Sequence, residues 1–228
     1  MTPQAIGPNI WLVDGPEIVA AAGFHYPTRM VVVRLSGGGL WLWSPVAPTE
    51  RLLTWLDGLG PVMALVAPNA LHHMSMAAWQ ARYPQAVLAA PARLRAKRPD
   101  LTIARDLPDA GLWPEDFSQL LLPNSIAPEI VFFHHASGTV LFCDLLQQMP
   151  PDWFTGWRRI VAHLDLMTAP EPMVPRKFRL ALRPRGPVRQ AIDTLLGWPV
   201  RQVVMAHGPL VSKDAPGFLL RAFAWLKR

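Results

Sequence analysis

The pattern of apolar and polar positions in the first quarter of the chain is typical of β-strands. Residues 10–13, 30–35 and 40–44 are short apolar runs, and the turn sequence Asp14-Gly15-Pro16 predicts the end of the first run. Three consecutive glycines at 37–39 predict a hairpin between the second and third runs. Thr49 then predicts the N-cap of a helix that ends near Gly58.

Beyond residue 60, apolar strands alternate with helices. Residues 62–67 and 86–90 are continuous apolar runs, as expected of strands that are covered on both faces. The remaining pattern predicts strands over 117–122, 130–134, 139–143 and 202–206, helices over 75–83, 92–97, 152–164, 187–196 and 216–226, and loops over 98–116 and 165–186. This mixture of hairpins and strand–helix units predicts an α/β sandwich, with residues 1–228 forming a single domain.

Composition narrows the class of protein. With 51% hydrophobic and 17% charged residues, the chain is too apolar for intrinsic disorder, yet no run of apolar residues is long enough for a transmembrane helix. The start of the chain lacks the pattern of a signal peptide, and a single cysteine, Cys143, excludes an internal disulfide framework. We therefore expect a cytoplasmic protein that does not associate with a membrane.

Charge gives a weaker indication of the partner. Lysine and arginine number 22 against 16 acidic residues, a net charge of +6, and several of the basic residues lie between 176 and 189. Such an excess favours an anionic small-molecule substrate or ligand, but by itself it does not establish nucleic-acid binding. Oligomeric state is left open, with a homodimer as one option, because Trp153 and Trp157 fall on one face of a predicted helix.

Polar side chains follow three of the predicted strands. His72 and His73 lie in the loop after the strand 62–67, Asp144 follows the strand 139–143, and His207 follows the strand 202–206. Sites in open α/β sheets form at the carboxyl ends of strands. Imidazoles and carboxylates are ligands for zinc, manganese or iron, so the placement predicts a metal site at one sheet edge. The alternative is that each residue lies separately on the surface.

These segments resemble the metallo-β-lactamase fold superfamily. Residues 61–73 resemble its metal-binding loop, 139–146 the strand that ends in its bridging aspartate, and 203–209 its last metal histidine with the glycine that follows. The opening segments 11–16 and 28–35 are similar to an uncharacterised branch, a domain of unknown function with a Pro-Asn…His-His loop. The resemblance implies a four-layer αββα sandwich.

The metal-binding loop departs from the superfamily pattern His-x-His-x-Asp-His. With the last histidine placed at His73, His72 stands at the aspartate position, and Ala70 and Pro68 stand at the first two histidine positions. Asn124 is the nearest candidate for the third ligand of the first metal. The resemblance therefore implies that the first metal site is lost and that His72, His73, Asp144 and His207 keep the second. Successive side chains of an extended loop diverge, so whether both loop histidines face the site stays open.

The functional prediction is a metal-dependent hydrolase-like protein with one divalent metal. Zinc suits the ligand set best, with manganese or iron as alternatives, and the substrate is unknown. His25, Asn69 and Asn124 are the predicted substrate-binding residues, whereas Cys143 is interpreted as a small buried hydrophobe. The alternative is a non-catalytic binding protein on the same fold that has lost the metal. Nucleic-acid processing ranks third.

Overall fold

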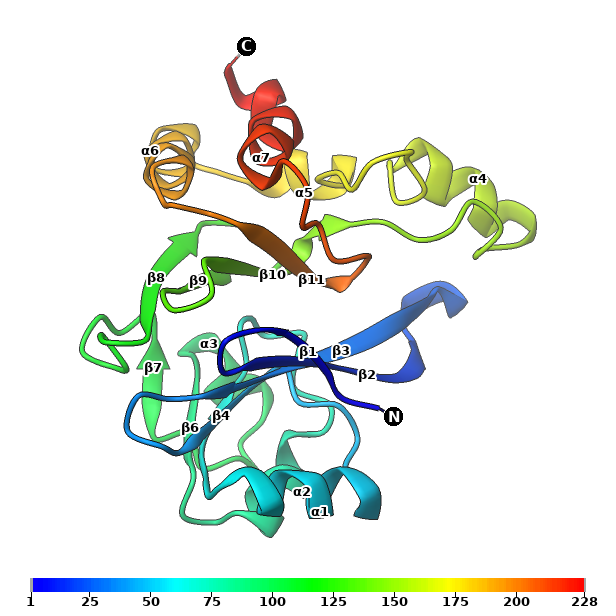
Figure 1. The fold of residues 1–228 in the computed structure, drawn as a ribbon. Helices are drawn as coiled ribbons and strands as arrows, with labels where there is room; N and C mark the ends of the chain where they lie inside the picture. The colour runs from blue at the N-terminus through cyan, green and yellow to red at the C-terminus, as the bar shows by residue number, and fades with distance from the viewer. Residues whose placement is uncertain (1, 228) are drawn as a thin grey trace.

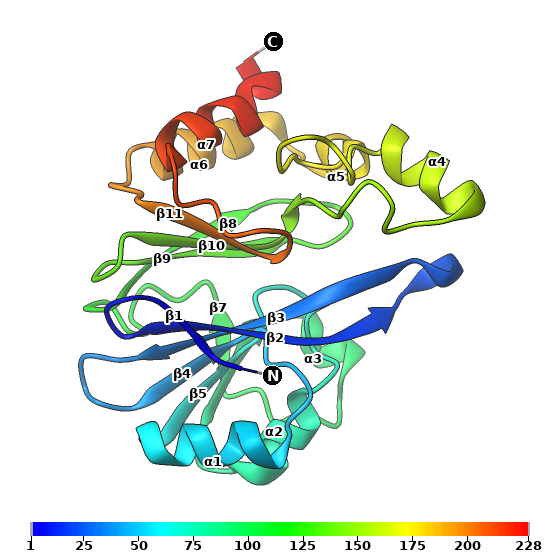
Figure 2. The same ribbon diagram turned by 45° about the vertical axis from the view of Figure 1, so that its right-hand side comes forward.

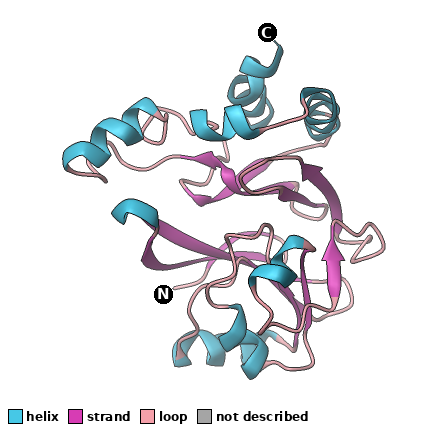
Figure 3. Ribbon diagram, turned by 180° about the vertical axis from the view of Figure 1, so that it is seen from behind, coloured by secondary structure: helices cyan, strands magenta, loops and turns pink. Residues whose placement is uncertain are grey.

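Two β-sheets packed face to face form the centre of the molecule, and helices cover both outer faces (Figures 1 and 2). The computed structural model describes residues 2–227. The view from behind shows the same succession of four layers: helices, sheet, sheet and helices (Figure 3). The predicted four-layer αββα sandwich is confirmed.

The first sheet contains the first seven strands in sequence order. Its strands are β1 (Gln4–Gly7), β2 (Ile10–Val19), β3 (His25–Arg34), β4 (Leu40–Trp43), β5 (Val62–Val66), β6 (Val87–Pro91) and β7 (Arg105–Leu107). Pairing is antiparallel from β1 to β4 and parallel from β4 to β7. Its outer face packs against α1 (Glu50–Leu59), α2 (Met76–Arg82) and α3 (Arg93–Lys97). The predicted cap of α1 is confirmed, because the Thr49 hydroxyl accepts a hydrogen bond from the Leu52 amide.

The second sheet has the strand order β11-β10-β9-β8. Its strands are β8 (Phe117–Leu122), β9 (Glu129–His134), β10 (Thr139–Gln147) and β11 (Gln202–His207), with β10 and β11 parallel. Three helices cover this sheet, α5 (Arg176–Ala181), α6 (Arg185–Leu196) and α7 (Ala215–Phe223), while α4 (Gly156–Leu164) extends to one side (Figure 1). Short 3₁₀ turns occupy Ala21–Gly23 and Ala224–Lys227. None of these helices, within residues 2–227, is long and apolar enough to cross a lipid bilayer.

Apolar side chains from both sheets fill the space between them. Trp41 and Trp43 of β4 are fully buried there against Phe132 of β9 and Leu141 of β10. The Trp41 ring stacks on Phe117 with the centroids 4.3 Å apart. Since burial of apolar surface is the main favourable term in folding, this layer fixes how the two sheets, and the strand ends that carry the polar residues, lie against each other.

Three local predictions are wrong. Asp14-Gly15-Pro16 is not a turn but lies inside β2, where a register shift between Gly15 and Ile18 gives Pro16 a place outside the regular ladder. His25 accordingly begins strand β3 instead of lying in a loop. The predicted loops 98–116 and 165–186 contain β7 and α5, two short elements that tertiary packing stabilises more than local sequence does.

Candidate functional site

His72, in the loop after β5, meets Asp144 and His207 beside the two sheets. Asp144 lies in the last part of β10, which extends beyond the predicted end at residue 143, and His207 is the last residue of β11. Nε2 of His72 lies 3.3 Å from Oδ2 of Asp144, and Nε2 of His207 lies 3.4 Å from Oδ1 of the same carboxylate. The two imidazole rings have their centroids 5.2 Å apart. Asp144 is 7% exposed and His207 4%. The structure thus brings together three of the four residues that the sequence proposes as metal ligands.

A break in the regular pairing of β10 places Asp144 in this position. Pairing with β9 ends at Leu141, and the register with β11 shifts between Phe142 and Gln147. The amides of Cys143, Asp144 and Leu145 donate instead to the carboxylate of Glu129, at 2.8, 2.9 and 3.0 Å. Because it accepts these three hydrogen bonds, the carboxylate of Glu129 takes the place of the missing strand partner. The side chain is fully buried.

Asn69 joins the loop that carries His72 to the strand that carries Asp144. Its Oδ1 accepts hydrogen bonds from the amides of Leu71 and His72 at 2.8 and 3.1 Å. Its Nδ2 donates to Asp144 Oδ2 at 2.6 Å and to Cys143 Sγ at 3.1 Å. The sequence suggests a substrate contact here, but the side chain is fully buried and uses both its ends within the chain. Asn69 therefore positions the site residues.

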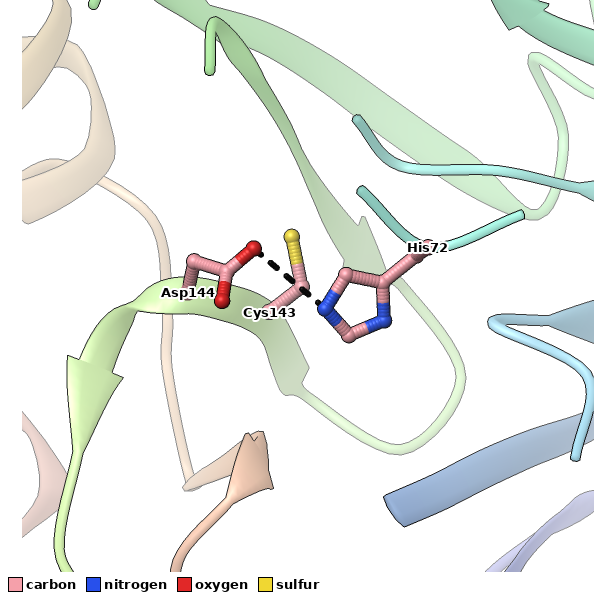
Figure 4. A group of neighbouring side chains, drawn as sticks. All are labelled: His72, Cys143 and Asp144. Atoms are coloured by element: carbon pink, nitrogen blue, oxygen red, sulfur yellow. Dashed lines mark ion pairs between the residues drawn. The ribbon is translucent and has the colours of Figure 1, made fainter. Parts of the chain in front are cut away.

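The donor atoms form a compact set. Among the described residues, His72, Cys143 and Asp144 offer ligand atoms that all lie within 4.8 Å of one another (Figure 4). Cys143 and Asp144 are adjacent in the chain, yet both contribute, because the strand has left its regular alternation at this point. The thiol of Cys143 is thus a candidate ligand that the sequence interpretation treats only as a hydrophobe.

The outer nitrogens of the two histidines are held by the protein. Nδ1 of His207 lies 2.7 Å from the carbonyl oxygen of Pro27, which can only accept, so this nitrogen carries the proton. Nε2 of His207 faces the Asp144 carboxylate, and a cation between the two would contact both. His72 Nδ1 makes a hydrogen bond of 2.7 Å with Ser44 Oγ. Such outer hydrogen bonds are usual for metal-ligating histidines, so the residues fit a divalent metal.

The electrostatics of the buried carboxylates also fits a divalent metal at this site. Burial alone would raise the pKa of Asp144, but the neighbouring His72 and His207 outweigh burial and hold this pKa well below its usual range. Burial, together with the nearby charge of Asp144, raises the pKa of Glu129 to about 7. Burial also raises the pKa of the Cys143 thiol, which must lose its proton to bind a metal. Asp144 is consequently the permanent negative charge of the site.

The remaining predicted residues lie apart from this set. His73 Nδ1 accepts a hydrogen bond of 2.8 Å from Arg98, and burial together with Lys97 and Arg98 lowers its pKa. His25 pairs with Glu17 at 2.7 Å and stacks on Trp153. Asn124 is buried; its Oδ1 accepts from the amides of Ile126 and Ala127, while its Nδ2 has no hydrogen-bond partner within residues 2–227.

A pocket of about 420 Å³ opens over the site. Asp144, His72 and His207 line it together with Ser44 at the end of β4, and most of its other lining residues are apolar. Ser44 adopts a left-handed backbone conformation with φ of 50°, a strained geometry that occurs often at functional positions. Ser44 also follows a strand, so the strand-end reasoning that found Asp144 and His207 could have found it. The role of Glu129 could not have been found in this way, because Glu129 is the first residue of its strand and does not follow one.

Comparison with known proteins agrees with this architecture. Residues 8–93 match the model of a domain of unknown function, DUF4336. No curated protein sequence matches the chain. Among solved structures, a metallo-beta-lactamase from Pontibacter korlensis is 17% identical, with a TM-score of 0.61 and 98% of both chains covered.

Two further structures have the same fold. The metal-soaked Flv1 flavodiiron core from Synechocystis sp. PCC6803 is 13% identical, with a TM-score of 0.68, and the match covers 99% of this chain and 60% of that one. The mono-zinc form of the metallo-beta-lactamase FIM-1 from Pseudomonas aeruginosa is 16% identical, with a TM-score of 0.59 and coverage of 98% and 95%. Identities this low establish the fold and not the activity. The chain is therefore a metallo-β-lactamase-fold protein whose first part matches an uncharacterised family.

Proposed function

We propose that the protein is a metal-dependent hydrolase-like protein that binds one divalent cation between His72, Asp144 and His207. The observation that carries the proposal is a buried, ionised carboxylate flanked by two imidazole Nε2 atoms at 3.3 and 3.4 Å. Cys143 Sγ is a further candidate donor, within 4.8 Å of the ligand atoms of His72 and Asp144. Imidazole, thiolate and carboxylate together suit zinc best, with manganese or iron as alternatives. His73 is left out of the proposed set because its Nδ1 already accepts from Arg98.

In the proposal, Asp144 and the residues around it hold and orient the metal ligands. A bound metal ion would polarise an ester, amide or phosphoester oxygen and lower the pKa of water. Asp144 supplies negative charge to the ligand set, while Asn69 and Glu129 fix its orientation through the hydrogen bonds described above. The carbonyl of Pro27 keeps the proton of His207 on Nδ1. The pocket above provides room for a small-molecule substrate. The single domain and the cytoplasmic location stay predictions from the sequence.

Metal content tests the proposal directly. The protein is purified without chelator and without a nickel-binding tag, and metals are measured by plasma mass spectrometry. We expect about one divalent ion per chain, as for a mononuclear site. His207→Ala and Asp144→Ala remove a ligand and should abolish uptake. His163→Ala is the matched control, because His163 is an exposed histidine on α4, away from the site.

Two results would contradict the proposal. One is a metal content below about 0.1 per chain after incubation with zinc and manganese, since a three-donor site should load at micromolar metal. The other is a full metal content in His207→Ala, which would place the ion elsewhere on the protein.

A binding protein without a metal is the second candidate, and one observation favours it. Both oxygens of Asp144 have protein partners, because Asn69 and His72 contact Oδ2 and His207 contacts Oδ1. With protons on both Nε2 atoms, these contacts satisfy the carboxylate without a metal, as expected of a protein that has lost it. Thermal unfolding separates the two candidates: a metal that binds the native state must raise the melting temperature, whereas the binding protein should show no shift with zinc or manganese.

A further inference from the structure

The pocket over the proposed metal centre combines a polar floor with an apolar entrance. Asp144, His72 and His207 form its polar side, whereas Ile18, Val46 and Phe178 contribute apolar surface. A pocket of about 420 Å³ lies within the usual range for sites that bind small organic molecules. Its shape and lining therefore suit a ligand with a substantial apolar body.

Large apolar side chains also surround the entrance. Val19, Leu71, Met74 and Ile126 all line the pocket and are 77%, 42%, 70% and 46% exposed. They come from the tip of β2, the His72 loop and the loop between β8 and β9. A group of exposed apolar residues around a pocket is characteristic of a binding site. Contact of this surface with water is unfavourable, and a bound ligand would remove the surface from water.

Two lysines from different halves of the sandwich line the same pocket. Lys97, at the end of α3, is exposed, and its Nζ donates to the Ala70 carbonyl at 2.9 Å. No carboxylate of residues 2–227 lies within ion-pair distance of Lys97. Lys177, in α5, lies 3.3 Å from Asp165 and 6.0 Å from the centre of the Tyr26 ring. Asp144 is the one carboxylate among the described residues that line the pocket, and the proposed metal would neutralise it.

We propose that the pocket binds an amphipathic anion: a molecule with a bulky acyl or aryl body and one anionic group, a carboxylate, sulfonate or phosphate. The apolar body contacts the entrance residues and the walls, and the anionic group pairs with Lys97 and Lys177. The inference rests on the proposed function, because it names the substrate class of that metal centre. A neutral apolar compound leaves Lys97 without an ion pair and Lys177 paired only with Asp165. A small polar anion leaves the apolar entrance in water.

A pair of fluorescent probes tests the charge requirement. 8-Anilino-1-naphthalenesulfonate and N-phenyl-1-naphthylamine share the same aromatic body, and only the first carries a sulfonate. In the protein as purified, we expect the sulfonate to bind at least about tenfold more tightly, which corresponds to about 1.4 kcal/mol. Lys97→Met and Lys177→Met should each weaken the sulfonate about three- to tenfold and change the neutral probe less than twofold.

Two control variants locate the probe. Lys213→Met removes an exposed lysine that lies outside the pocket and should leave both affinities unchanged. Ile160→Ser removes a 64% exposed side chain from the apolar surface of α4 and should also have no effect. The proposal is overturned if both probes bind equally, if neither binds, or if the sulfonate depends on Ile160 and not on the two lysines.

Metal content measured on the same samples separates this inference from the proposed function. Normal metal content with no preference for the sulfonate rejects the substrate class and leaves the metal centre standing. Lysine-dependent binding of the sulfonate without any metal rejects the hydrolase-like function and supports the amphipathic anion as the ligand of the pocket.

Discussion

Replacement of Asn69 by aspartate probes the contact that holds the site together. The new side chain has the same shape, and one of its oxygens can still accept from the amides of Leu71 and His72. The other oxygen takes the place of Nδ2, which lies 2.6 Å from Asp144 Oδ2. Two carboxylates at this distance cannot both be ionised, so the pair must keep one proton when the protein folds.

The structure gives the size and the pH dependence of the effect. Like charge and burial should raise the carboxyl pKa by about 2–3 units, which equals about 3–4 kcal/mol. The folded variant then binds one proton more than the unfolded chain between about pH 4 and pH 7, so its stability falls as pH rises. Relative to the original protein, we expect a loss of about 1.5 kcal/mol at pH 5 and about 3–4 kcal/mol at pH 8.

Urea unfolding in EDTA at pH 5 and pH 8 measures both values. Asn124→Asp is the matched control, because Asn124 is also buried and its Oδ1 also accepts two backbone amides, but its Nδ2 faces no protein partner within residues 2–227. The loss of stability in this control measures the cost of burying a carboxyl group without the repulsion from Asp144. The double variant Asn69→Asp/Asp144→Asn exchanges donor and acceptor and should regain at least half of the lost stability at pH 8.

The reasoning would be refuted by a loss that is the same at pH 5 and pH 8. It would also be refuted if the double variant were no more stable than Asn69→Asp, because the destabilisation would then have no connection with Asp144.

Three further predictions concern single side chains. Ser44→Gly relieves the left-handed backbone but removes the hydrogen bond to His72, so the free energy of unfolding should change by less than about 1 kcal/mol while zinc affinity, measured by chelator competition, falls about tenfold. Burial lowers the pKa of His134 to about 4, so stability should be lost as pH falls from 6.5 to about 4, by about 2–3 kcal/mol; His134→Gln should flatten this slope in urea titrations. Trp41→Ala should cost about 3–5 kcal/mol in urea unfolding, against less than about 1 kcal/mol for Trp157→Ala, which is half exposed.

The sequence predicts the fold where local pattern and tertiary environment agree. The run 62–67 is apolar because β5 lies in the middle of a sheet with helices on one face and the second sheet on the other, where all of its residues except Met63 are buried. Asp144 and His207 lie close together because β10 and β11 are parallel neighbours. His72 follows β5 of the other sheet, so its contact with Asp144 depends on how the two sheets pack. Chain position predicts that these residues lie close together on the condition that their strands are neighbours, and the resemblance supplies the set of candidate ligands.

The details that depend on contacts between distant segments could not be predicted. Asp14-Gly15-Pro16 has the composition of a turn, but pairing with β3 draws it into a strand. Cys143 becomes a candidate ligand only because Glu129, fourteen positions earlier, binds the backbone of β10 and ends its alternation. Likewise, the divergence of His72 and His73 depends on Arg98, which holds His73. None of these partners is signalled by spacing in the chain.

Anomalous diffraction from crystals grown with zinc, recorded on both sides of the zinc absorption edge, tests the metal centre most directly. We expect one peak per chain, in contact with Asp144 and with Nε2 of His72 and His207, and no peak beside Pro68 and Ala70, which offer no side-chain donor. Absence of a peak at Asp144 would contradict the metal centre. Two peaks about 3.5 Å apart, the spacing of a two-metal site, would contradict the single-metal assignment.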